Sequence, residues 1–187
     1  DEAFVVPLHV GWNMIGSPRQ TPVAVEDLEF EAEGEQPVGY AEAVASGLIQ
    51  EFIYRWSPQN GYVEAPQLTA FKGYWVRCMN SDGALLRFPP VGSISQQRPS
   101  QPKVAGRELD WKLKLAAQAG GISCSAACLG VAADASEGLD RYDCQAPPAF
   151  GPQVTVRFRD PAGGSTATYL RDVRPASPGG RTWELQV

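Results

Sequence analysis

The sequence runs Trp111-Lys112-Leu113-Lys114-Leu115-Ala116-Ala117 over its clearest periodic stretch. Apolar and polar side chains alternate from Trp111 to Leu115, which places them on opposite faces and predicts a half-buried β-strand. Residues 154–159 alternate in the same way. Gly occurs 19 times and Pro 16 times, between short apolar runs, which is typical of short strands joined by turns. The sequence therefore predicts a mainly β protein.

A segment rich in Pro, Ser and Gln divides the chain into two halves. Residues 91–104 carry no hydrophobic period, so we expect an extended linker there. Each half has its own strands and aromatic residues. We predict two small antiparallel β-sandwich-like domains. The first is a β-rich domain at residues 1–90 with one short helix, and the second is a β-sandwich domain at residues 105–187 with a cysteine-stapled loop.

Two hairpins are expected in the first domain. Residues 51–56 and 61–64 flank a turn that ends with Asn60-Gly61. Residues 73–78 and 84–88 flank a second turn that also contains Asn and Gly. These residue types supply the positive φ that a tight turn requires.

The remaining elements are weaker patterns. Residues 41–48, rich in Ala, Glu and Leu, predict the short helix. Further strands are expected at residues 167–173 and 182–187, separated by turns rich in Gly and Pro.

The composition argues against several classes of function. With a formal charge of -5 and a pI near 4.9, the chain lacks the basic footprint of a nucleic-acid-binding protein. No apolar run approaches the roughly 20 residues of a membrane-spanning helix, so we expect no membrane span. The chain begins Asp1-Glu2-Ala3, without Met, which we interpret as a processed mature form or an excised fragment.

The four cysteines, Cys78, Cys124, Cys128 and Cys144, are candidates for disulfides. An even number in a turn-rich acidic chain favours an oxidising compartment. Three of them lie in a region rich in Gly, Ala and Ser, which we interpret as a loop that Cys124–Cys144 or Cys128–Cys144 would close. Cys78 lies in a predicted strand and would be a buried thiol or reach across to the loop. Zinc is disfavoured because the only histidine, His9, is distant in sequence.

Two motifs stand out, Gly11-Trp12-Asn13-Met14-Ile15-Gly16 and Gly73-Tyr74-Trp75-Val76. They resemble a β-rich module of bacterial secreted and cell-surface proteins, which a GWN(L/M)I strand opens and a GYWV strand closes. The resemblance covers most of residues 4–90. The second half resembles a β-sandwich segment met near the C-terminal ends of such proteins, from which the cysteines depart. The resemblance implies an architecture and an extracellular or cell-surface location, and it carries over no catalytic residue.

Exposed aromatic rings would allow carbohydrate binding, because flat rings stack on the apolar faces of sugars. Neighbouring strand residues point to opposite faces, so one of Tyr74 and Trp75 is expected to be exposed. Core packing is the competing interpretation, and we expect it for the tryptophans at positions 12, 111 and 183. The ligand-stacking candidates are Tyr54, Trp56, Tyr62, Tyr74 and Trp75.

Asp134, Asp140 and Asp143 are the candidates for a calcium site, since Ca²⁺ takes several oxygen ligands from a flexible loop. Their spacing does not match the loop of an EF-hand. The alternative is a solvated turn capped by Asp side chains. No other cofactor is expected.

No arrangement of residues in the sequence indicates an enzyme. A Ser-His-Asp triad or a cysteine nucleophile would need His9, which lies in a predicted strand without a Gly-x-Ser-x-Gly motif. Phosphate-loop and dinucleotide-binding motifs are absent from the sequence. Carboxylate pairs for glycoside hydrolysis carry no signal in a chain with 21 acidic residues. We therefore expect no catalytic residue.

The expected function is a non-catalytic extracellular structural or adhesive module within a cell-surface assembly or filament. Its strand edges would bind protein partners or other copies, because their unpaired N–H and C=O groups accept another strand. Residues 4–10 and 182–187 are the expected donors. The alternatives are a carbohydrate-binding module, with a glycan as partner, and an accessory domain of a secreted hydrolase.

Overall fold

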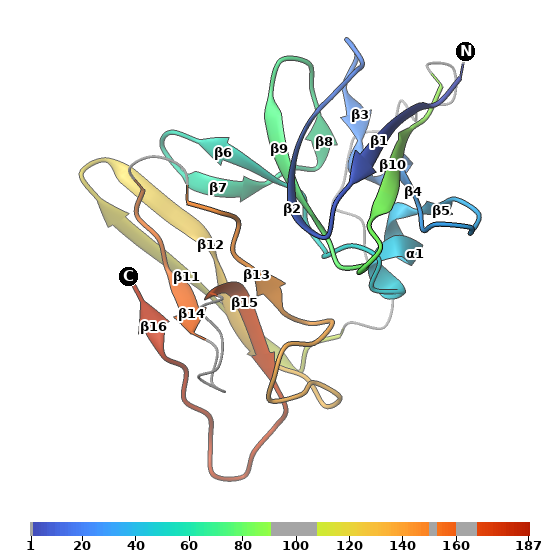
Figure 1. Cartoon of the computed structure of the whole chain (residues 1–187). Coiled ribbons are helices and arrows are strands. Elements are labelled where there is room, and N and C mark those ends of the chain that lie inside the picture. Colours follow the sequence, from blue (N-terminus) through green and yellow to red (C-terminus); the bar gives the residue numbers. More distant parts are fainter. Residues whose placement is uncertain (1, 91–107, 150–152, 160–167) are drawn as a thin grey trace. The chain divides into compact units, whose positions relative to one another are not determined.

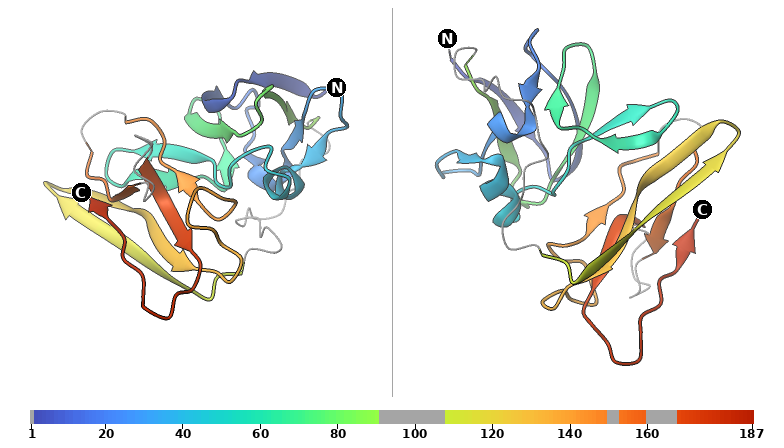
Figure 2. Two further views of the ribbon diagram at one scale, coloured as in Figure 1. Left: turned by 60° about the horizontal axis from the view of Figure 1, so that its bottom comes forward. Right: turned by 180° about the vertical axis from the view of Figure 1, so that it is seen from behind.

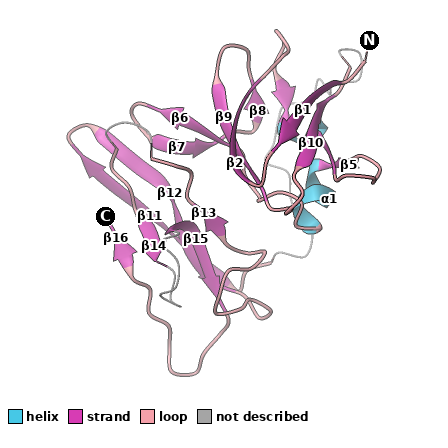
Figure 3. Cartoon of the chain, in the orientation of Figure 1, coloured by secondary structure: helices cyan, strands magenta, loops and turns pink. Residues whose placement is uncertain are grey.

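The structure is a computed structural model that describes residues 2–90, 108–149, 153–159 and 168–187 (Figure 1). Within these ranges the protein is mainly β and has one short α-helix, which confirms the predicted fold class (Figure 3). The predicted linker at residues 91–104 lies outside the described residues.

Two compact units make up the chain. Unit 1 comprises Asp1–Arg55 and Glu64–Ala105, and unit 2 comprises Trp56–Val63 and Gly106–Val187. Residues 56–63, which the sequence analysis placed in the first domain, therefore group with unit 2.

The described residues up to position 90 form ten short strands, a 3-10 helix and an α-helix. In chain order they are β1 (Phe4–Leu8), β2 (Gly11–Gly16), β3 (Val23–Ala24), η1 (Val25–Asp27), β4 (Glu29–Glu31), β5 (Val38–Gly39), α1 (Tyr40–Ala45), β6 (Tyr54–Ser57), β7 (Gly61–Glu64), β8 (Gln67–Leu68), β9 (Gly73–Cys78) and β10 (Ala84–Phe88). The helix is close to the one expected at residues 41–48, and Gly47, with φ +77°, follows its end.

Unit 1 is built on small antiparallel sheets around one core. Their strand orders are β1-β10-β4-β5, β2-β9-β6-β7 and β3-β8, and the second sheet includes residues 56–63, which group with unit 2. Phe30 and Leu86 of the first sheet and Tyr74 and Val76 of the second are at most 1% exposed. They share one buried cluster with Val44 of α1, so both larger sheets and the helix bury their apolar faces against each other.

A bend at residues 9–11 leads from β1 into β2. Gly11 has φ +90°, a conformation that a side chain would strain. The Asn13 side chain closes the bend: its Oδ1 accepts the N–H of His9 (2.9 Å), and its Nδ2 donates to the carbonyls of His9 (2.7 Å) and Gly11 (3.0 Å). The Gly and the Asn of the Gly-Trp-Asn motif thus fix the junction between two sheets.

The strands β9 and β10 coincide with the predicted ranges, but they do not pair with each other. β9 pairs with β2 and β6, whereas β10 pairs with β1 and β4. The turn between them is present, since Gly83 N–H donates to Asn80 O at 3.1 Å. Gly83 has φ +81°, and a Cβ there would lie 2.6 Å from the carbonyl oxygen of Leu8. The expected hairpin is therefore wrong in its pairing, and its turn connects two sheets.

In unit 2 the strands form one sheet. They are β11 (Trp111–Ala119), β12 (Ile122–Val131), β13 (Cys144–Gln145), β14 (Arg157–Arg159), β15 (Thr168–Arg174) and β16 (Leu185–Gln186). The order is β11-β12-β15-β14-β16, with β13 also paired to β15. β12 and β15 run parallel, so the sheet is mixed, whereas antiparallel pairing was expected throughout. The sheet curls on itself into a half-barrel (Figure 2).

Strand β12 occupies a region that the sequence analysis interpreted as a loop. It spans ten residues and pairs with β11 through a turn at Gly120-Gly121, whose φ angles are +58° and +81°. Small residues in β12 also let β11 approach closely, because a Cβ on Gly130 would lie 2.8 Å from the carbonyl oxygen of Trp111. The low strand propensity of Gly, Ala and Ser concealed this strand.

Candidate functional site

Three of the five ligand-stacking candidates are buried. Tyr54 is 2%, Tyr62 5% and Tyr74 1% exposed. The Tyr74 hydroxyl accepts the N–H of Thr69 (2.8 Å), and the Tyr62 hydroxyl donates to the carbonyl of Pro148 (2.5 Å). These rings belong to the packed interior and do not face solvent, so they offer no stacking surface.

The two tryptophan candidates, Trp56 and Trp75, are half-buried. Trp75 meets Trp12 edge to face, with ring centroids 6.5 Å apart and planes at 88°. Trp56 meets Tyr62 in the same manner, at 5.2 Å and 75°. Edge-to-face packing is a favourable arrangement between aromatic side chains. Neither pair presents two coplanar rings to a sugar.

The three calcium candidates are tied into the loop between β12 and β13. The Asp140 carboxylate accepts the N–H groups of Ser136 (2.6 Å) and Tyr142 (2.7 Å). The Asp143 carboxylate accepts the N–H groups of Asp140 (2.9 Å) and Val173 (2.8 Å). Asp134 accepts hydrogen bonds from the side chains of Arg141 and Tyr142. Every oxygen of the three carboxylates therefore accepts a hydrogen bond within the protein.

These carboxylates cap the backbone N–H groups of the loop. This is the arrangement expected of a turn capped by Asp side chains, the alternative to a calcium site. In the described residues no group of three or more His, Cys, Asp or Glu side chains is arranged to hold a metal ion. Burial raises the pKa of Asp143 from 3.8 to about 7, against the opposing effect of the N–H groups of Val173 and Asp140. The pKa of Asp134 is lowered, mainly by the hydrogen bond from Tyr142.

The predicted disulfides of the second domain are not formed. All four cysteines lie in the described residues, and the structure links none of them to another. Cys128 of β12 and Cys144 of β13 are both Cα partners of Arg171, one on each edge of β15. Two strand spacings, or roughly 9–10 Å, separate these Cα atoms, and a disulfide requires about 4.4–6.8 Å. The strand between them therefore prevents a Cys128–Cys144 disulfide, and Cys124 of β12 is linked to neither of them.

Cys78 was expected either as a buried thiol or in a disulfide to the loop, and the structure shows a buried thiol. It is 1% exposed in β9, and its thiol donates to the carbonyl of Asn80 (3.7 Å). Burial raises the pKa of this thiol, which disfavours the reactive thiolate. Cys78 thus behaves as a small apolar core residue.

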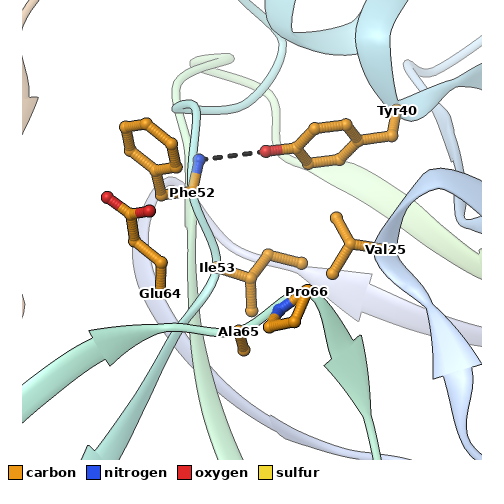
Figure 4. Close-up of a pocket in the computed structure, with 7 residues that line it drawn as sticks. All are labelled: Val25, Tyr40, Phe52, Ile53, Glu64, Ala65 and Pro66. Atoms are coloured by element: carbon orange, nitrogen blue, oxygen red, sulfur yellow. Dashed lines mark hydrogen bonds between the residues drawn. The ribbon is translucent and has the colours of Figure 1, made fainter. Parts of the chain in front are cut away.

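A shallow hollow in unit 1 lies between the α1 region and the start of β8 (Figure 4). Its cavity volume is about 10 Å³, room for roughly one water molecule, whereas small-molecule sites take roughly 300–1,000 Å³. Its lining residues are Val25, Tyr40, Phe52, Ile53, Glu64, Ala65 and Pro66. Phe52 N–H donates to the Tyr40 hydroxyl (3.0 Å), so the backbone across the hollow is held from within. One carboxylate on an apolar wall provides no catalytic arrangement.

The end strands of the unit 2 sheet, β11 and β16, carry apolar side chains that remain exposed. Leu113 pairs with Leu129, and Leu185 pairs with Phe158. Both partners belong to the buried core of unit 2, so Leu113 and Leu185 lie on the core-facing side of the sheet. They are nevertheless 52% and 49% exposed, which is unusual for this side of a sheet.

Two tryptophans show how close the edges come. Trp111 of β11 and Trp183, two residues before β16, have ring centroids 6.0 Å apart at 76°. The sheet therefore curls until β11 and β16 border the same opening, which we call the open side of unit 2. Trp111 was expected in the core, but its side chain is 46% exposed, so that prediction is wrong.

Arg174 holds the segment that leads into β16. Its guanidinium forms a buried ion pair with Asp172 (2.9 Å) and donates to the carbonyl of Thr182 (2.8 Å). Its Cζ lies 5.2 Å from the ring centre of Trp183, a cation–π distance. The edge at β16 is thus fixed by charge and ring contacts as well as by pairing with β14.

The sequence predicts only part of the open side of unit 2. The alternation at 111–117 predicted an apolar face, but nothing local in the sequence indicates that this face stays uncovered. In the described part of the chain, no helix is long and apolar enough to cross a membrane. The chain matches no family model, no curated protein and no solved structure.

Proposed function

We propose that this chain is a non-catalytic structural or adhesive module, extracellular or at a cell surface, that joins an assembly through the edges of its sheets. The observation that carries the proposal is the exposure of Trp111, Leu113 and Leu185 on the core-facing side of unit 2. Neighbouring exposed apolar residues mark surfaces that another molecule covers. A strand added to a sheet edge covers such residues and pairs the free backbone groups.

An edge of unit 1 offers a second observation in favour. β1 is the first strand of its sheet, and its residues Phe4 and Val5 are 50% and 38% exposed. Pro7 lies in the same strand, as is typical of an edge position. The proposed extracellular location rests on the resemblance of the Gly11–Gly16 and Gly73–Val76 motifs to those of bacterial secreted and cell-surface modules.

Sedimentation velocity over a wide range of concentration tests the assembly. We expect a species of defined size above the monomer, whose fraction grows with concentration. A strictly monomeric chain at the highest concentration would contradict the proposal. Binding on a glycan array that is lost in Trp75→Ala, with no self-association, would support the carbohydrate-binding alternative instead.

A further inference from the structure

We infer that the Asn60-Gly61 pair, in the turn between β6 and β7, is a site of spontaneous backbone modification, at which asparagine converts to aspartate and isoaspartate through a succinimide ring. The inference is independent of the proposed function and does not require the chain to assemble. Asn60 is exposed, and Gly61 has φ +65° and no side chain to shield its nitrogen. A backbone nitrogen that follows asparagine can attack the side-chain amide, and glycine hinders this attack least.

The reaction needs only water and hydroxide as co-reactants. Gly61 N forms a bond to Asn60 Cγ while its amide proton passes to hydroxide. The Cγ–Nδ2 bond of Asn60 then breaks, and the amide nitrogen leaves as ammonia. Water opens the resulting ring at either of its two carbonyls. One opening gives an aspartate, and the other gives an isoaspartate, in which the backbone runs through the former side-chain carboxyl.

Two serine hydroxyls contact the amide group that reacts. Ser123 Oγ, at the start of β12, donates to Asn60 Oδ1 (3.1 Å), and Asn60 Nδ2 donates to Ser57 Oγ (3.4 Å). Asn60 Oδ1 gains negative charge when the nitrogen attacks, so Ser123 is placed as an oxyanion donor. The departing nitrogen needs a proton, which the adjacent Ser57 hydroxyl can transfer and regain from water.

The Ser123 hydroxyl is available to Asn60 because its other acceptor is already satisfied. Ser123 Oγ also lies 3.1 Å from Gln59 O, but that carbonyl accepts the N–H of Ser123 at 2.8 Å. The hydroxyl proton can therefore point to Asn60 Oδ1 without leaving the Gln59 carbonyl unpaired. Asn60 N–H donates to Ser57 O at 3.3 Å, which helps to hold the reacting groups in place.

The two other asparagines of the chain lack this arrangement. The Asn13 side chain closes the bend before β2, and Asn80 Nδ2 donates to Gly83 O (2.8 Å). Methionine follows Asn13 and serine follows Asn80, so a side chain shields the next backbone nitrogen in both cases. These two positions are therefore internal controls within the same molecule.

Modification would change the contact between the turn and β12. Isoaspartate adds one carbon atom to the backbone between Gln59 and Gly61, so the Gln59 carbonyl and its hydrogen bond from Ser123 N–H are displaced. The reaction also places a new carboxylate in a chain whose net charge is already -5. The turn thus carries a slow chemical change that weakens the attachment of residues 56–63 to the rest of unit 2.

Peptide mapping by mass spectrometry after incubation at mildly alkaline pH tests the site. We expect Asn60 to lose its amide while Asn13 and Asn80 keep theirs. The rate should rise with pH, because hydroxide takes the proton of the attacking nitrogen. Retention of the amide at Asn60, or loss at equal rates at all three asparagines, overturns the inference.

Ser123→Ala tests the role of the hydroxyl, and the direction of the effect separates chemistry from structure. Loss of one hydrogen bond to the developing oxyanion should slow the reaction roughly tenfold. A hydroxyl that only holds the turn would act the other way, because a looser turn reaches the cyclising conformation more often. Ser123→Thr retains the hydroxyl and should keep the wild-type rate, as should Ser125→Ala, at an exposed position of the same strand. An unchanged or faster rate in Ser123→Ala overturns the assistance by Ser123.

Discussion

Replacing Gly83 by alanine is expected to destabilise unit 1 by about 3 kcal/mol or more. The new Cβ would lie 2.6 Å from the carbonyl oxygen of Leu8, a backbone atom that cannot turn aside as a side chain does. Positive φ adds about 1–2 kcal/mol for any L-residue with a Cβ, and overpacking adds about 1–3 kcal/mol. Urea unfolding followed by tryptophan fluorescence measures the loss.

Gly47→Ala is the matched control for this substitution. Gly47 has φ +77°, close to the +81° of Gly83, but nothing lies within 4 Å of a Cβ built on it. The free energy of unfolding of Gly47→Ala should fall only by the cost of placing an alanine at positive φ, about 1–2 kcal/mol. Equal losses in the two variants would show that the approach of Leu8 does not matter. The difference between them isolates the contact that holds the β9–β10 turn against the end of β1.

Unit 2 is expected to lose stability as the pH rises from about 4 to about 7, because of Asp143. Its pKa is raised by burial to about 7 in the folded state, from 3.8. The folded state therefore holds the proton more tightly than the unfolded state, so stability is highest below the unfolded pKa and falls as the carboxyl ionises. A shift of this size corresponds to roughly 4 kcal/mol between the two limits.

Asp143→Asn tests the assignment, since the amide keeps an oxygen acceptor for Val173 N–H and cannot ionise. Urea unfolding of the wild type and the variant at a series of pH values should show that the decline disappears in the variant. Asp110→Asn, at an exposed position of the same unit, should keep it. A wild-type decline that persists in Asp143→Asn would locate the titrating group elsewhere.

Local pattern was sufficient to predict the bounds of several strands, although it did not predict their partners. β7, β9 and β10 have the bounds that turn residues and alternation predicted. The exchange of partners between β9 and β10 could not be predicted, because the same alternating strand fits several neighbours. The close approach of Leu8 to Gly83 and the positive φ of Gly11 both belong to the connections between these sheets.

In the cysteine region, by contrast, the sequence failed to predict a strand that is present. β12 pairs along its whole length with β11, yet its Gly, Ala and Ser residues gave no strand signal. Since those residues were interpreted as a loop, disulfides looked feasible there. Cys128 and Cys144 lie on opposite sides of β15. The spacing of the cysteines in the sequence could not predict this, because it depends on contacts between residues far apart in the chain.

The candidate site was foreseen as an edge but not as an opening. The sequence predicts residues 182–187 as a donor strand and an apolar face at 111–117. It could not show that the sheet curls far enough to bring Trp111 against Trp183. The same sheet contains the parallel pairing of β12 with β15, which joins residues far apart in the chain.

Each unit contains one pair of indole rings in edge contact, Trp12 with Trp75 in unit 1 and Trp111 with Trp183 in unit 2. Two indoles this close couple their electronic transitions, which gives an exciton signal in circular dichroism while the pair is intact. Trp12→Phe removes the signal of one unit, and Trp111→Phe removes that of the other. The chain therefore carries an intrinsic optical label for each unit, and the label in unit 2 lies at the opening between β11 and β16.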